Sequence, residues 1–113
     1  MKTWTLRFRK VDKRNFEELR SGIKSVETRA ASIKHQPIEK GDTLIFICGK
    51  DKFSKIITKK NHFKSIDAMF NKVPFRKIMP DLKSKQEAEK RYYSYPNYKE
   101  KIKEFGILAF ELE

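Results

Sequence analysis

Hydrophobic and polar residues alternate at the start of the chain, over the stretch 3–9. Trp4, Leu6 and Phe8 occupy one parity, so the pattern predicts a strand with one buried face and one basic face. Apolar and β-branched residues predict further strands at 43–48, 53–63 and 107–112. Lysines stand on both parities of the 53–63 stretch, which leaves the register of that strand open.

A short helix is predicted after the first strand. Its apolar residues lie three and then four positions apart, at Phe16, Leu19 and Ile23. Asp12 or Asn15 can cap the start of this helix, and Gly22 supplies a stop signal. Lys24 is therefore expected at the end of the helix.

The second half of the chain contains further helical segments. Ser65 can cap a brief helix, and Ser84 with Glu87 forms a capping box that opens a longer one. The segment 74–80 predicts turns with a helical fragment, and a last helix stops at Gly106. This order of elements, without repeats or linkers, predicts an α+β fold: a mixed or antiparallel sheet or small β-barrel with peripheral helices.

Composition sets the size of the fold and the kind of partner. The chain has 113 residues, 38% of them hydrophobic, which suits one domain over residues 1–113 with one core. Lys and Arg number 27 against 15 Asp and Glu, for a formal charge of +12. Such an excess favours a polyanionic partner, whereas a lysine-rich composition of the whole proteome is an equally good explanation.

Cysteine usage and hydropathy predict the compartment. Cys48 is the only cysteine and lies in the apolar run LIFIC, where a buried, inert thiol is expected. The sequence has neither the long apolar stretch of a membrane span nor the apolar core of a signal peptide at its start. We therefore expect a cytoplasmic protein without a membrane partner.

One cluster of charges stands out after the first helix. The alternation of residues 25–30 places Glu27 and Arg29 on the same face of a strand, about 6.6 Å apart, and Thr28 on the other face. Lys24 is close enough in sequence to join them. The cluster is a candidate binding site, and a surface ion pair beside a helix-terminal lysine is the alternative.

The order of elements and one motif carry a family resemblance. The motif is G-x-K-x-x-E-x-R, formed by Gly22, Lys24, Glu27 and Arg29, and it is followed by the Gly41-Asp42 turn and a tyrosine-rich segment before Gly106. Over nearly its whole length the chain resembles the ASCH domain family of the PUA-like superfamily. The resemblance implies a small β-barrel flanked by helices, with a cleft lined by the lysine, glutamate and arginine of the motif.

The resemblance also implies a class of ligand. PUA-like domains bind RNA, often modified RNA, and ASCH members are associated with RNA binding, ribonuclease activity and hydrolysis of N4-acetylcytidine. RNA or nucleotide binding through Lys24, Glu27 and Arg29 is therefore the leading expectation, with Lys24 and Glu27 as catalytic residues if the protein is an enzyme. A basic protein-interaction domain is a third possibility.

The enzymatic alternative divides into two chemistries. The amidohydrolase members are similar to this chain at Lys24, but they use a threonine nucleophile where this sequence has Glu27, and Thr28 is expected on the opposite face. A metal-independent ribonuclease needs a cation for the phosphorane-like charge, for which Lys24 or Arg29 is suited. Glu27 or a tyrosine would then transfer protons.

Other residues are predicted to extend the RNA surface. Tyr93 is the expected stacking platform for an unpaired base, with Arg91 beside it, because Tyr92, Tyr95 and Tyr98 have the spacing of core residues. Residues that can follow the phosphate backbone are Arg7, Arg9 and the lysine-rich stretch 50–64.

No motif indicates a metal or cofactor. The two histidines, His35 and His62, lie in different regions, and neither a zinc spacing nor a glycine-rich phosphate loop is present. We expect no metal and no cofactor. The sequence leaves the oligomeric state open, with a monomer favoured.

Overall fold

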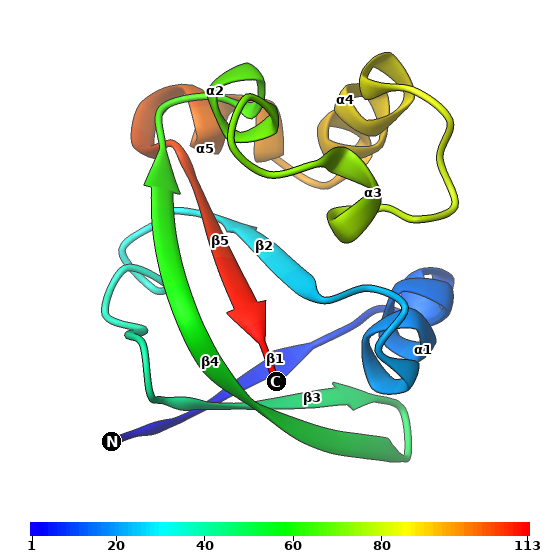
Figure 1. Cartoon of the computed structure of the whole chain (residues 1–113), viewed down its shortest axis with the longest axis vertical. Coiled ribbons are helices and arrows are strands. Elements are labelled where there is room, and N and C mark those ends of the chain that lie inside the picture. The colour runs from blue at the N-terminus through cyan, green and yellow to red at the C-terminus, as the bar shows by residue number, and fades with distance from the viewer.

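The computed structural model describes all residues, 1–113, and has an α+β fold in which a curled five-stranded sheet forms a half-barrel (Figure 1). The strand order is β1-β3-β4-β5-β2, so β1 and β2 are the two edges of the sheet. The strands are β1 (Thr3–Arg7), β2 (Val26–Ala30), β3 (Thr43–Cys48), β4 (Asp51–Phe63) and β5 (Ile107–Leu112). The predicted fold class is confirmed.

β4 holds the half-barrel together because it belongs to both parts of the sheet. Its first half pairs with β3 and its second half with β5, both antiparallel, and the register shifts between Ile57 and Lys59. An irregularity of this kind bends a strand and increases its twist, which curls the sheet around its core. The remaining pairs are parallel between β1 and β3 and antiparallel between β2 and β5.

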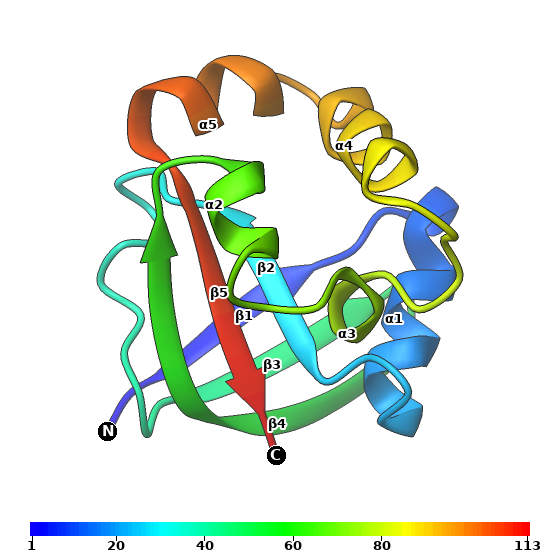
Figure 2. The same cartoon turned by 45° about the horizontal axis from the view of Figure 1, so that its top comes forward.

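The helices gather on one side of the sheet, apart from α1 (Figure 2). They are the 3-10 helix η1 (Lys10–Asp12), α1 (Lys13–Ser21), α2 (Ile66–Phe70), α3 (Phe75–Ile78), α4 (Lys85–Ser94) and α5 (Tyr98–Phe105). The longest of them has ten residues. No helix is long and apolar enough to cross a membrane.

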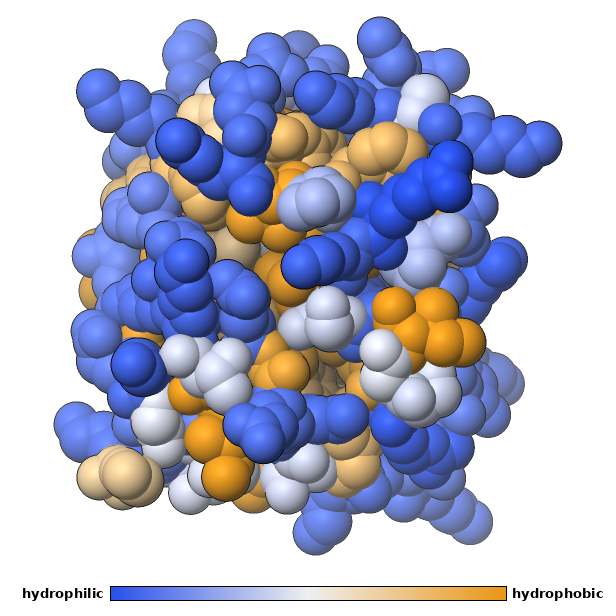
Figure 3. Space-filling view, viewed as in Figure 1, coloured by the Kyte–Doolittle hydropathy of each residue, from blue (hydrophilic) through white to orange (hydrophobic).

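Two clusters of buried side chains make up the core. One lies inside the half-barrel and under α1, around Phe16, Phe46 and Phe110. The other lies beneath the remaining helices, around Met69 and Tyr92. Hydrophilic side chains surround the face of the molecule shown in Figure 3, with apolar groups between them.

Several sequence predictions hold to the residue. β3 and β5 have the predicted bounds, and α5 ends directly before Gly106, as predicted. Ser65 and Ser84 cap α2 and α4 by accepting hydrogen bonds from the main-chain N–H groups of Ala68 and Glu87. Cys48 is buried, as the LIFIC pattern predicts. These predictions depend only on residues close together in the sequence, and the packing of the whole chain does not change the elements that they describe.

Gly22 stops the first helix as predicted, but the placement of Ile23 and Lys24 in that helix is wrong. Gly22 adopts a left-handed conformation with φ 88°, so α1 stops at Ser21 and neither Ile23 nor Lys24 is helical. Ile23 is 66% exposed and does not belong to the core. Two strand bounds also differ from the prediction. β1 ends at Arg7 instead of residue 9, and β4 begins at Asp51 instead of residue 53.

Candidate functional site

A cavity of about 180 Å³ lies where the half-barrel remains open, between the edge strands β1 and β2. Helices α1 and α4, together with the start of α5, complete its wall. Its lining residues are Arg7, Phe8, Arg9, Asp12, Asn15, Lys24, Glu27, Thr28, Arg29, Met79, Tyr92, Tyr95, Pro96 and Tyr98. The three charged residues of the predicted motif are thus brought together at this cavity.

Glu27 is the centre of the charged group. Its Oε1 lies 3.5 Å from Lys24 Nζ and accepts a hydrogen bond of 3.0 Å from the main-chain N–H of Thr28. Its Oε2 accepts a hydrogen bond of 3.2 Å from Arg29. Because Lys24 is 4% and Glu27 3% exposed, the alternative of a surface ion pair is wrong.

The chain delivers Lys24 to the cavity through a loop. Gly22 ends α1, and the N–H of Lys24 then donates to the carbonyl of Glu18 over 3.0 Å. The next residue, Ser25, donates to the carbonyl of Lys77. These two bonds attach the main chain at Lys24 and Ser25 to its surroundings, and the lysine side chain enters the cavity from there.

Arg29 connects the two edge strands. Its guanidinium carbon lies 5.0 Å from the ring centre of Phe8, which follows β1, while its NH2 group holds Glu27 on β2. The contact combines a cation–π attraction with the ion pair. The arginine thereby forms part of the cavity wall where backbone pairing between β1 and β2 is absent.

Three tyrosines form an aromatic wall. Tyr95 packs edge-on against both Tyr92 and Tyr98, with ring centres 6.2 Å and 5.3 Å away. Burial raises the pKa of the Tyr95 phenol to about 12, and it also raises the pKa of Tyr92 and of Tyr98. These phenols therefore remain protonated at neutral pH and act as hydrogen-bond donors rather than as bases.

The sequence predicts that Tyr92, Tyr95 and Tyr98 are core residues and that Tyr93 contacts the ligand, and this prediction is only partly right. Tyr92 is a core residue, as predicted, and its hydroxyl is hydrogen-bonded to that of Thr28. Tyr95 and Tyr98 pack against the core as well, and all three tyrosines line the cavity. Tyrosines from α4, from its C-cap and from the start of α5 thus serve both the core and the site, which their spacing in the sequence cannot show.

Arg7 and Arg9, which the sequence predicts on a surface that follows the phosphate backbone, both line the cavity. Arg9 is paired with Asp12 over 2.8 Å, and its guanidinium lies 5.7 Å from the ring centre of Tyr95. Arg7 has no acidic partner within 4.0 Å. Four basic and two acidic residues line the cavity, which suits an anionic ligand.

Asn15 is a cavity residue that the sequence reasoning missed. The sequence indicates it only as a possible helix cap, yet it is 8% exposed and its Nδ2 donates to the Tyr95 hydroxyl over 3.4 Å. Its Oδ1 has no partner. Asn15 stands four positions before Leu19, and a polar residue beside the apolar stripe of the helix is the sequence signal that indicates it.

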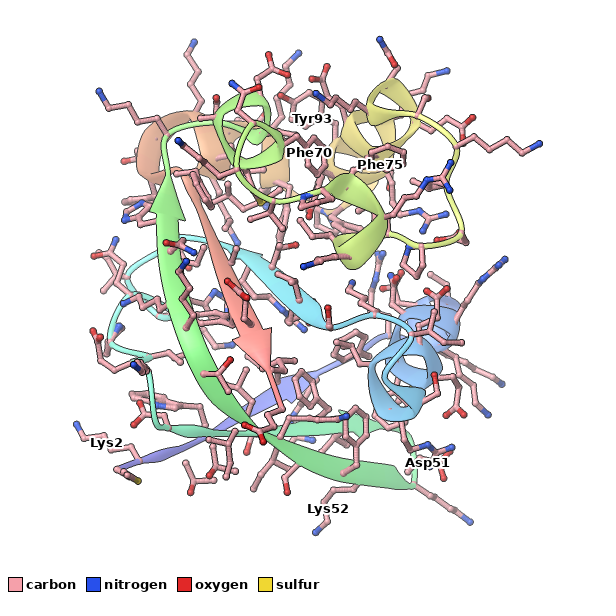
Figure 4. The ribbon with its side chains drawn as sticks, viewed as in Figure 1. Lys2, Asp51, Lys52, Phe70, Phe75 and Tyr93 are labelled. Carbon is pink, nitrogen blue, oxygen red and sulfur yellow. The ribbon has the colours of Figure 1, made fainter.

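Tyr93 and Arg91 lie outside the cavity, in contrast to the expectation that they form the stacking platform. Tyr93 is 40% exposed and lies among the helices, far from Lys52 at the other end of the molecule (Figure 4). The Arg91 guanidinium is held by both carboxylate oxygens of Asp81, at 3.0 Å and 2.7 Å, so it is not free to lie over a base.

The histidines are also absent from the cavity. His62 Nε2 lies 2.7 Å from the carbonyl oxygen of Phe105, and His35 Nδ1 lies 3.2 Å from that of Ala30. Each ring is thus held by a main-chain carbonyl. No three His, Cys, Asp or Glu residues gather in a way that could hold a metal ion.

No family model and no curated protein matches the sequence. Among solved structures, the crystal structure of the hypothetical protein PH0355 is similar, with a TM-score of 0.84 and 26% identity over 100% of this chain and 98% of the other. The solution structure of protein PF0455 from Pyrococcus furiosus has a TM-score of 0.74 and 24% identity over 100% and 96%. These similarities establish the fold over the full chain, and neither name states an activity.

Proposed function

We propose that this protein is an RNA-binding domain of the ASCH type that holds one unpaired base in the cavity around Lys24, Glu27 and Arg29. The observation that carries this proposal is a buried carboxylate shared by two cations at a cavity with an aromatic wall. The predicted family motif supplies all three charged groups.

Lys24 and Arg29 have N–H donors that no protein group uses. An ammonium has three N–H donors and a guanidinium five. Lys24 has a single ion-pair contact, 3.5 Å long, and the Arg29 guanidinium has one hydrogen bond to Glu27. The remaining donors can serve the carbonyl and ring-nitrogen acceptors of a base, or a phosphate at the rim beside Arg7.

The size and wall of the cavity favour one base. A cavity of about 150 Å³ is enough to hold benzene. The volume here, about 180 Å³, therefore suits a single flat ring and not a stacked pair. Unpaired bases in RNA complexes stack on aromatic side chains, which Tyr95 and Tyr98 provide here. Neighbouring nucleotides then lie on the basic surface outside.

The arrangement of protons supports binding more than catalysis. Both carboxylate oxygens of Glu27 are already engaged, and the phenols at the cavity remain protonated. The Thr28 hydroxyl, the other candidate nucleophile, is hydrogen-bonded to Tyr92 in the core. Asp12, the other carboxylate at the cavity, is paired with Arg9. Among these groups none is free to act as the general base or nucleophile that ribonuclease or amide-hydrolysis chemistry requires.

The test is binding of single-stranded RNA by the wild type, by Lys24→Met and by Lys72→Met. Both variants lose one positive charge, but Lys72 is exposed and lies outside the cavity. We expect Lys24→Met to weaken binding about tenfold or more, and Lys72→Met to have only the small effect of one distant charge. Glu27 keeps Arg29 as a partner in Lys24→Met, so the fold should survive.

Equal losses in the two variants would show that the attraction is general electrostatics and that the cavity plays no part. The same RNA, and N4-acetylcytidine, should be incubated with the wild type in the presence of a chelator. Product formation that disappears in Lys24→Met would replace the binding proposal with the enzymatic one.

A further inference from the structure

The cavity occupies the one place where the barrel lacks a strand-to-strand seam. β1 and β2 stand at opposite ends of the strand order, and residues of both line the cavity. An edge strand presents unpaired N–H and C=O groups. Along each edge strand, alternate residues bond to the neighbouring strand. This alternation determines which main-chain groups face the cavity.

On β1 the even-numbered residues bond to β3. Thr43 N–H donates to the carbonyl of Lys2 over 2.9 Å, and Phe8 N–H donates to the carbonyl of Ile47 over 2.8 Å. In a parallel pair, alternate residues of one strand bond to the same neighbour. Arg7, an odd-numbered residue at the cavity, therefore directs its N–H and C=O away from β3 toward the open edge.

On β2 the odd-numbered residues bond to β5. Leu112 N–H donates to Ser25 over 3.0 Å, and Ala31 N–H donates to Gly106 over 2.9 Å. Thr28 lies between them with the opposite phase, so its main-chain groups face the open edge. Its N–H is taken by Glu27 Oε1, which leaves the Thr28 carbonyl as a free acceptor at the cavity.

We propose that the main chain of the two edge strands reads the bound base: Arg7 N–H donates to an acceptor on the base, and the Thr28 carbonyl accepts from an N–H of the base. The inference rests on the proposed RNA binding. The ligand class is an unpaired base whose edge carries both an acceptor and an N–H donor. Such a base joins β1 to β2 through hydrogen bonds and completes the half-barrel.

The strand phase supplies a test that leaves the sheet intact. Proline lacks an N–H and is tolerated at edge positions whose N–H faces outward. Arg7→Pro removes the proposed donor and the side-chain charge, whereas Arg7→Ala removes only the side chain. Thr5→Pro is the matched control, because Thr5 shares the outward phase on β1 but does not line the cavity.

The probes are single-stranded RNA hexamers of each of the four bases. We expect Arg7→Ala to weaken the best hexamer a few-fold, Arg7→Pro to weaken it about tenfold further, and Thr5→Pro to bind as the wild type does. Equal affinities of Arg7→Pro and Arg7→Ala would overturn the inference. If no hexamer binds the wild type, the proposed function and this inference both fall.

Amide NMR spectra of the wild type give a second readout that needs no variant. Addition of the best-binding hexamer should move the Arg7 amide resonance downfield and protect that proton from exchange. If the amides of residues 24–29 shift and the Arg7 amide does not, the base lies in the cavity without the proposed contact. In that case RNA binding stands and main-chain reading is wrong.

Discussion

Two carboxylates are buried almost equally in this protein, Glu27 at 3% and Asp42 at 6% exposure, yet their surroundings differ. Asp42 accepts hydrogen bonds from the main-chain N–H groups of Lys2 and Glu39, both 3.0 Å long, and from the indole of Trp4 at 2.8 Å. Glu27 instead shares its charge with the cations of Lys24 and Arg29.

The two sets of partners explain two different roles. An N–H of the main chain or an indole has one proton to donate, so the donors around Asp42 are used up and tie the first strand to the Gly41-Asp42 turn. The cations around Glu27 keep free donors, and these line a cavity. Although the two carboxylates are buried to a similar extent, Asp42 therefore has a structural role, whereas Glu27 belongs to a candidate binding site.

The largest effect that separates the two regions is expected from Glu27→Ala. The change leaves the Lys24 ammonium buried without an acidic partner, and loss of one member of a buried ion pair costs about 3–5 kcal/mol. Urea unfolding measures the loss. Glu39→Ala, which breaks the exposed pair with Lys60, is the control and should cost less than about 1 kcal/mol.

A second change identifies the cause of that loss. Adding Lys24→Met to Glu27→Ala removes the stranded ammonium, so the double variant should be more stable than Glu27→Ala alone. If the double variant is instead less stable by the sum of both single losses, the side chains act independently and the buried charge is not the cause.

A smaller, pH-dependent effect is expected from Asp42→Asn. Hydrogen bonds, first that from Lys2 N–H, lower the pKa of Asp42 from 3.8 to about 2. Because the folded-state pKa is the lower one, the stabilisation is complete above about pH 4 and is lost as the pH falls toward about 2. Unfolding free energies of wild type and Asp42→Asn should differ at neutral pH and converge in acid. A constant difference would mean that ionisation of Asp42 contributes nothing.

The smallest effect is expected from Tyr93→Ala. Tyr93 is exposed and lies outside the cavity, so both stability and RNA affinity should stay close to wild type, within about 0.5 kcal/mol. Tyr98→Ala removes a ring from the cavity wall and is the positive control. A large loss of RNA affinity in Tyr93→Ala would move the binding surface from the cavity to the helices.

Local signals in the sequence were enough for most elements. The alternation of residues 43–48 and 107–112, the caps at Ser65 and Ser84 and the stop at Gly106 act within a few residues, so they predict β3, β5 and the starts and ends of helices. The stop at Gly22 is likewise local and was predicted. The error was to continue the apolar spacing past this glycine to Ile23, because a left-handed C-cap residue ends the helix at once.

The composition of the site was predictable only in part. The charged motif Lys24, Glu27 and Arg29 lies within six residues of sequence, and strand alternation places two of its members together. The Asn15–Tyr95 contact joins residues 80 positions apart, and the Arg91–Asp81 pair depends on how α4 packs. The periodicity of a sequence describes one helix or strand at a time, so it does not predict contacts between residues of different elements.

The sequence by itself thus determined β3, β5, the caps at Ser65 and Ser84 and the charges near Glu27, because these follow from neighbours along the chain. Only the tertiary structure decided that Glu27 is buried at a cavity and that Arg7 and Thr28 direct main-chain groups toward an open seam. The physical reason is that burial and strand phase depend on which elements pack together, and that choice minimises the free energy of the whole chain.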